Sequence, residues 1–82
     1  MSINTFLQQT FVPMVEVFQT NVSQPHQAKS LITQLLQHFP DSKINFDLDD
    51  CDKILRVEGL NFLADKVMRL LEENGFNCQL LV

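Results

Sequence analysis

One apolar stripe at helical spacing constrains the fold of this 82-residue chain more than any other feature. The large apolar residues in its first half recur at i, i+3, i+4, i+7, i+8 and i+11, which is one face of an α-helix. They are Ala28, Leu31, Ile32, Leu35, Leu36 and Phe39. Ser23 or Gln24 is the predicted N-cap, and Pro25 falls in the first turn, where its missing N–H removes no needed donor. The stripe therefore predicts an amphipathic helix that ends near Pro40.

Short strands are predicted on both sides of this helix. Residues 15–20 (VEVFQT) are rich in β-branched and aromatic side chains, which favour strands. Residues 43–48 (KINFDL) alternate polar and apolar side chains, as a half-buried strand does. Residues 49–52 (DDCD) then predict a tight polar turn.

The second half repeats the same order of elements. Residues 53–58 alternate and end at Gly59, which predicts a strand. Asn61 is the predicted N-cap of a second helix, and Asn74 and Gly75 are predicted to stop it, with Gly75 in the left-handed conformation. The apolar stripe of that helix is Leu60, Leu63, Ala64, Val67, Leu70 and Leu71. Residues 76–82 alternate again and predict the last strand.

The resulting order, β-α-β-β-α-β, predicts an α+β fold. Two such halves joined by a hairpin form a ferredoxin-like sandwich, a four-stranded antiparallel sheet with two helices on one face. The expected order of strands across the sheet is fourth, first, third, second. We assign residues 15–82 to this domain and residues 1–14 to a short N-terminal segment, with a possible helix capped by Ser2.

Composition excludes several classes of function. Six Lys and Arg against ten Asp and Glu give a net charge of −4, which argues against binding to a nucleic-acid backbone. No apolar run approaches the ~18 residues of a membrane span, and no basic and apolar leader opens the chain. Two cysteines are too few for a disulfide scaffold. We therefore expect a cytoplasmic protein that binds neither membrane nor nucleic acid.

From residue 15 to residue 82 the chain resembles the heavy-metal-associated domains, small copper-chaperone-like modules of the ferredoxin-like fold. The resemblance lies in the order and lengths of the elements and in residues 67–81 (VMRLLEENGFNCQLL). This stretch is similar to the family's last helix, its Gly-aromatic turn and its final strand. Members of the family hold a soft metal in a loop of the form Met-x-Cys-x-x-Cys, between the first strand and the first helix.

The corresponding loop of this chain lacks the metal ligands. Val22 stands in place of the methionine, and Gln24 and Gln27 stand in place of the two cysteines. A glutamine carbonyl is a poor ligand for a soft ion such as Cu(I) or Zn. Ser23 and His26 complete the loop, and His26 alone has no second ligand beside it. The resemblance thus implies the fold, whereas we expect neither a metal nor another cofactor.

The remaining chemically active side chains predict no catalytic site. Cys51 lies in the predicted turn among Asp49, Asp50 and Asp52, close to Asp47, and these charges disfavour a thiolate. The calcium-loop pattern fails there, so we interpret the turn as a solvated one. Cys78 alternates with apolar neighbours and is predicted to lie in the core, out of reach of Cys51. No Ser/His/Asp set or Gly-rich phosphate loop is present, so the chain is not expected to be an enzyme.

One feature points to an interaction. Helices cover only one face of such a sheet, so alternate residues of each strand face away from the core. With Val15 and Val17 placed inward, Phe18, Ile54 and Leu81 are predicted to form an apolar patch on the uncovered face. Such a patch is more often covered than bare, either by the N-terminal segment or by a second copy of the chain.

The sequence therefore favours a non-catalytic binding or assembly domain of the heavy-metal-associated type with a degenerate metal loop. It would act through a protein partner or a homodimer, by way of the sheet face. The alternative is a Cu or Zn carrier that uses His26 with a ligand from another chain. A small enzyme or ligand sensor is the third and weakest hypothesis.

Overall fold

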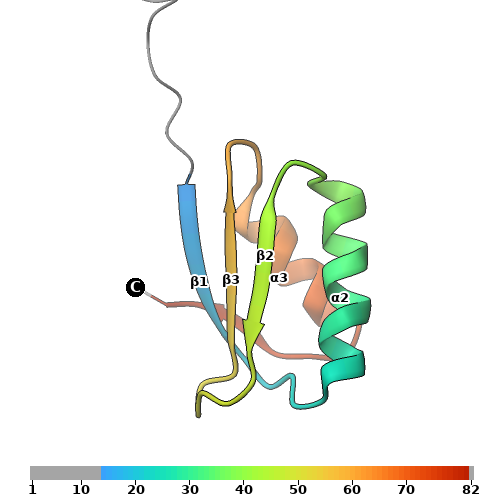
Figure 1. The fold of residues 1–82 in the computed structure, drawn as a ribbon, viewed down its shortest axis with the longest axis vertical. Coiled ribbons are helices and arrows are strands. Elements are labelled where there is room, and N and C mark those ends of the chain that lie inside the picture. Colours follow the sequence, from blue (N-terminus) through green and yellow to red (C-terminus); the bar gives the residue numbers. More distant parts are fainter. Residues whose placement is uncertain (1–13, 82) are drawn as a thin grey trace, which may run out of the picture.

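The computed structural model describes residues 14–81, which form one sheet and two helices (Figure 1). In chain order the elements are β1 (Met14–Thr20), α2 (Pro25–His38), β2 (Lys43–Asp47), β3 (Ile54–Gly59), α3 (Ala64–Glu73) and β4 (Cys78–Leu80). The short helix predicted after Ser2, and the place of residues 1–13 and 82, lie outside the described residues.

The sheet of the described residues has the order β2-β3-β1-β4, and every neighbouring pair is antiparallel. Both helices pack on the same face of this sheet (Figure 1). The predicted α+β fold, with its ferredoxin-like strand order, is confirmed. The opposite face, called the open face below, carries no helix of the described residues.

Helix α2 forms where its apolar stripe predicts. Its buried residues are Ala28, Leu31 and Leu35, and Phe39 is buried directly after the last turn. The N-cap is Gln24, one of the two predicted residues, and its carbonyl accepts the N–H groups of Gln27 and Ala28. The helix therefore follows the predicted cap and most of the stripe, although Ile32 is only half-buried and Leu36 is exposed.

Helix α3 begins later than the sequence predicts. Its N-cap is Leu63 rather than Asn61, because Leu60 and Asn61 form a bend and the Phe62 side chain enters the core, where it is 4% exposed. The predicted stop is confirmed, since Gly75 has a φ of +89° and its N–H donates to the Glu72 carbonyl at 3.0 Å. A left-handed residue after the last turn is the usual end of a helix, and glycine adopts it without strain.

The core lies between the sheet and the two helices. Its fully buried side chains come from every layer, and they are Phe18, Val22, Leu35, Leu55, Val57, Val67 and Leu71. At one end of this core the rings of Phe39 and Phe62 meet edge to face, with centroids 6.4 Å apart. Aromatic rings favour this arrangement, so the pair links the end of α2 to the segment before α3.

Candidate functional site

Strand β1 faces the opposite way from the prediction. Phe18 is fully buried beside Leu55 of β3, whereas Val17 lies opposite the exposed Arg56 on the open face. The placement of Phe18 on the open face is therefore wrong. A phenylalanine buries more apolar area than a valine, and the gain outweighs the half-burial of Glu16 on the same side.

Thr20 shares the inward side of β1 and is the buried polar residue that makes this arrangement possible. Its hydroxyl donates to the Lys53 carbonyl at 2.6 Å and accepts the Val22 N–H at 3.2 Å. A buried hydroxyl with both roles satisfied costs little, whereas an unpaired one would destabilise the domain. The same two bonds tie the loop after β1 to the turn between β2 and β3.

The open face carries an apolar patch, made of different residues from those predicted. Paired residues of neighbouring strands face the same side of a sheet, and the Leu81 N–H donates to the Val17 carbonyl at 2.8 Å. Leu81 and Val17 are therefore neighbours on this face, and Val15 continues the row along β1. Ile54 lies diagonally across from Val17 on β3, two residues before Arg56, the direct partner of Val17. We call Val15, Val17, Ile54 and Leu81 the open-face patch; Ile54 and Leu81 lie on it as predicted.

The half of the open face on β2 and β3 is charged. Lys43 and Asp47 are exposed on β2, and Arg56 and Glu58 approach to 3.7 Å on β3. The pairing register places Lys43 beside Glu58 and Asp47 beside Ile54. This half is therefore suited to water, as the sequence predicted for β2.

The half on β1 and β4 is uncharged, and it ends at an unpaired strand. Strand β4 is last in the sheet order, so its outer edge pairs with no strand of the described residues. Leu80 and Leu81 are 36% and 40% exposed. Beside them is a shallow recess lined by amides, where the Asn77 N–H donates to Asn21 Oδ1 at 2.8 Å. The described residues of this edge, Cys78 to Leu81, carry no charged side chain.

The loop of residues 22–27, predicted from the resemblance to be a degenerate metal loop, caps helix α2. Gln27 Oε1 accepts the backbone N–H of Gln24 at 3.2 Å, so the two residues at the cysteine positions bond to each other. Val22, at the methionine position, is fully buried in the core. Ser23 and His26 are exposed, and neither belongs to a cluster of potential metal ligands among residues 14–81. The side chains of Val22 and Gln27 therefore have structural uses in this loop.

The aspartate side chains of the acidic turn form hydrogen bonds with the backbone of the same turn. Within the described residues, the potential metal ligands that lie together are Asp50, Cys51 and Asp52, with ligand atoms within 4.8 Å of one another. Asp50 Oδ1 already accepts the Asp52 N–H at 2.8 Å, and the Lys53 ammonium donates to the Leu48 carbonyl at 2.8 Å. Such a turn is a common arrangement of exposed aspartates and needs no ion.

The two cysteines are free and differ in environment. Cys51 is exposed in the acidic turn, whereas Cys78 is 4% exposed in the core, as predicted for both. Burial, with a smaller effect from the Glu72 carboxylate, raises the pKa of the Cys78 thiol to about 12. Cys78 is therefore a neutral core side chain at physiological pH.

Sequence reasoning missed a second apolar surface, at the end of the molecule where β1 begins. Met14, Leu60 and Leu63 are 48%, 51% and 59% exposed. They line an open depression of about 440 Å³ with Phe39, Phe62, His38, Asn61 and Lys66. We call it the end depression. Its residues come from three separate segments of the chain, so no local pattern could have revealed it.

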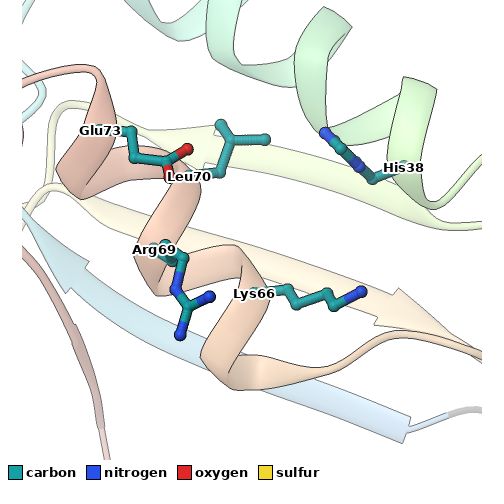
Figure 2. A pocket seen from close by; sticks show the side chains of 5 residues that line it. All are labelled: His38, Lys66, Arg69, Leu70 and Glu73. Carbon is teal, nitrogen blue, oxygen red and sulfur yellow. The ribbon is translucent and has the colours of Figure 1, made fainter.

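A smaller cavity of about 160 Å³ adjoins the end depression between α2 and α3, since both are lined by His38 and Lys66. Arg69, Leu70 and Glu73 complete its wall. Figure 2 shows Lys66 and Arg69 leaving α3 in different directions, with the Glu73 carboxylate directed toward neither of them. The cationic groups do not converge on one point, so the cavity lacks the geometry of an anion site.

Comparison with protein-family models, with curated proteins and with solved structures finds no match for this chain. Among residues 14–81, neither helix is long and apolar enough to cross a membrane.

Proposed function

We propose that this protein is a non-catalytic association domain that pairs with a second copy of itself through the β4 side of its sheet. It resembles a heavy-metal-associated domain in which a helix cap has replaced the metal ligands. The observation that carries the proposal is the uncharged half of the open face, which ends at the unpaired edge of β4. An enzyme or a metal carrier would need a converging set of reactive or ligating groups.

The free edge of β4 supports pairing with another strand. Natural sheets usually protect an exposed edge with charged residues, proline or a bulge. Residues 74–82 (NGFNCQLLV) contain neither charge nor proline. Because antiparallel strands alternate their hydrogen-bonding direction, and Leu81 bonds inward to Val17, the N–H and C=O of Leu80 point to the outer edge. These groups are available to a partner strand.

A second copy is the occupant favoured by charge. Each chain carries a net charge of −4, so two copies repel wherever their charged surfaces meet. A two-fold interface brings the same patch of both copies together. The β1 and β4 half of the sheet is a region where identical copies can meet without opposing like charges.

The open-face patch adds apolar contact to the strand pairing. Antiparallel pairing of β4 with its copy keeps both open faces on one side, which extends the row of Leu81, Val17 and Val15 across the junction. Fully burying an aliphatic side chain contributes ~1.5–3 kcal/mol. Leu80 and Leu81 of both copies, each more than a third exposed, are therefore enough for a measurable affinity.

The test measures the mass of the full chain by light scattering and native mass spectrometry. We expect a dimer for the natural sequence and a monomer for Leu81→Asp, because the carboxylate would have to be buried without a partner. The matched control is Asn45→Asp on β2, which introduces the same group on the same face at the other edge and should leave the dimer intact. Circular dichroism confirms that each variant is folded.

Hydrogen exchange identifies the mode of pairing. The Leu80 amide should be protected in the dimer and should exchange quickly in Leu81→Asp, whereas the Leu55 amide should be protected in both. A natural chain that stays monomeric at every concentration, or a Leu81→Asp variant that still dimerises, would contradict the proposal.

A further inference from the structure

The end depression is the most exposed apolar surface of residues 14–81. Leu63 and Leu60, at 59% and 51%, are the two most exposed large apolar side chains there, and Met14 at 48% is the third. All three line the same depression, over the buried edge-to-face pair of Phe39 and Phe62. Single exposed leucines need no explanation, whereas a cluster over a hollow indicates a binding surface.

The chain itself enters at the rim of this depression. Met14 is the first described residue, and its side chain is part of the lining. The thirteen residues before it can reach at most ~45 Å when fully extended, and no spacer separates them from the depression. Phe11 lies only three residues from Met14, which is about 10 Å of extended chain.

The chemistry of this segment matches an apolar hollow. Residues 1–13 (MSINTFLQQTFVP) contain no Lys, Arg, Asp or Glu. Their large apolar residues are Met1, Ile3, Phe6, Leu7, Phe11 and Val12. A segment that stays in water usually has few apolar side chains and many charges, and this one has the reverse composition. Docking it requires no charge to leave water.

We propose that residues 3–12 of the chain occupy its own end depression, with Phe11 as the anchor beside Met14, Leu60 and Leu63. A tethered segment competes at an effective concentration of about millimolar, so weak apolar contacts suffice and a separate molecule is at a disadvantage. The diverging Lys66 and Arg69 offer no focus for an acidic partner (Figure 2). This contact lies at a different site from the β4 edge and does not depend on self-association there.

The absence of tryptophan and tyrosine from the sequence allows a direct test on the full chain. In the variant Phe11→Trp, the single tryptophan reports whether position 11 is in an apolar site or in water. We expect blue-shifted emission under native conditions, which moves to the red when the protein is unfolded in denaturant. Adding Leu60→Asp or Leu63→Asp should also move it to the red, because the depression then presents a carboxylate.

Two controls complete the design. Leu36→Asp alters another exposed leucine, on α2, and Leu81→Asp alters the proposed dimer edge; neither should change the emission of Phe11→Trp. Emission that is independent of protein concentration assigns the contact to the same chain. Red-shifted native emission, no response to both Leu60→Asp and Leu63→Asp in variants that circular dichroism shows to be folded, or a blue shift that appears only at high concentration would overturn the proposal.

Discussion

The two halves of the open face have opposite chemistry on one continuous sheet. The half on β2 and β3 carries Lys43, Asp47 and the Arg56–Glu58 pair. The half on β1 and β4 carries Val15, Val17, Leu81 and neutral amides. Both halves rest on the same core, which buries the inward side of every strand.

This difference shows that the residues required for folding lie on the helix-covered face, whereas the residues of the open face can vary. The core requires apolar side chains only on the helix-covered face, so the open face is free to vary. Charges at the β2 edge act against pairing with another chain. Under the proposed function, we expect their absence at β4 to direct strand pairing to that edge.

The largest expected effect tests which side of β1 belongs to the open face. Phe18→Ala should lower the free energy of unfolding by ~3–5 kcal/mol, because it removes a fully buried ring. Val17→Ala, at the residue directly before Phe18, should lower the free energy of unfolding by less than half as much, since Val17 is only half-buried. Denaturant unfolding of both variants measures the difference. Equal losses would mean that β1 has no preferred face.

The next test compares the inward side of β4 with the turn between β2 and β3. With a pKa of about 12 against an ordinary value of 9.0, native Cys78 should be alkylated at pH 8 roughly a thousandfold more slowly than when unfolded. The exposed Cys51 should react at once. Mass spectrometry of labelled peptides distinguishes the two thiols, and similar rates would contradict the burial of β4.

The same pKa predicts a pH dependence of stability. The folded state holds the Cys78 proton more tightly than the unfolded state, so its contribution is complete below about pH 9 and is lost as the pH rises toward 12. Cys78→Ala should remove this dependence while lowering stability at neutral pH. Unfolding curves measured from pH 7 to the alkaline limit provide the measurement.

A third test makes the two edges alike. Lys43→Gln with Asp47→Asn removes the charges of β2 without altering the net charge. Two unprotected edges on one subunit permit open chains rather than a closed dimer, so we expect species larger than a dimer and about tenfold tighter association, or ~1.4 kcal/mol. Lys29→Gln with Asp41→Asn is the matched control, because both residues are exposed away from the sheet. Identical masses for the two double variants would show that the charges of β2 do not protect its edge.

The smallest expected effect concerns the turn that leads into β4. Gly75→Ala should lower the free energy of unfolding by about 1 kcal/mol, because alanine disfavours the left-handed conformation. A Cβ at this position meets no atom within 4 Å, so the whole effect comes from the backbone angle of +89°. An unchanged denaturant midpoint would show that the turn relaxes and does not fix the start of β4.

Local patterns were enough to predict the order of elements. The stripe of α2, the Asn74–Gly75 stop of α3 and the alternation in β3 depend on neighbours within one element, so the sequence contains them directly. The expected lack of metal binding by residues 22–27 stays a prediction, because it rests only on residue types that are poor ligands for a soft ion. The four-stranded order then follows from the rules of chain connection.

Features set by distant contacts could not be read in this way. Both sides of β1 offer apolar residues, and the choice between Phe18 and the valines is made by Leu55 and Leu80, far along the chain. The late start of α3 accompanies the packing of the Phe62 ring against the ring of Phe39, which lies after α2. The end depression could not be predicted either, because it combines residues from three segments that are distant in the sequence.

The Gln24–Gln27 bond has a consequence for protein engineering. A designer who writes cysteine at both positions removes the Gln27 side chain that caps the start of α2, and loss of a cap costs ~1 kcal/mol. The Thr20 hydroxyl meanwhile fixes the start of the loop, because it bonds both to the Lys53 carbonyl and to the Val22 N–H. A bound ion would then have to replace the stabilisation that the Gln27 side-chain amide gave to the start of α2. Such a protein would become a folding sensor, weaker when empty and restored when a soft ion ties the two thiolates together.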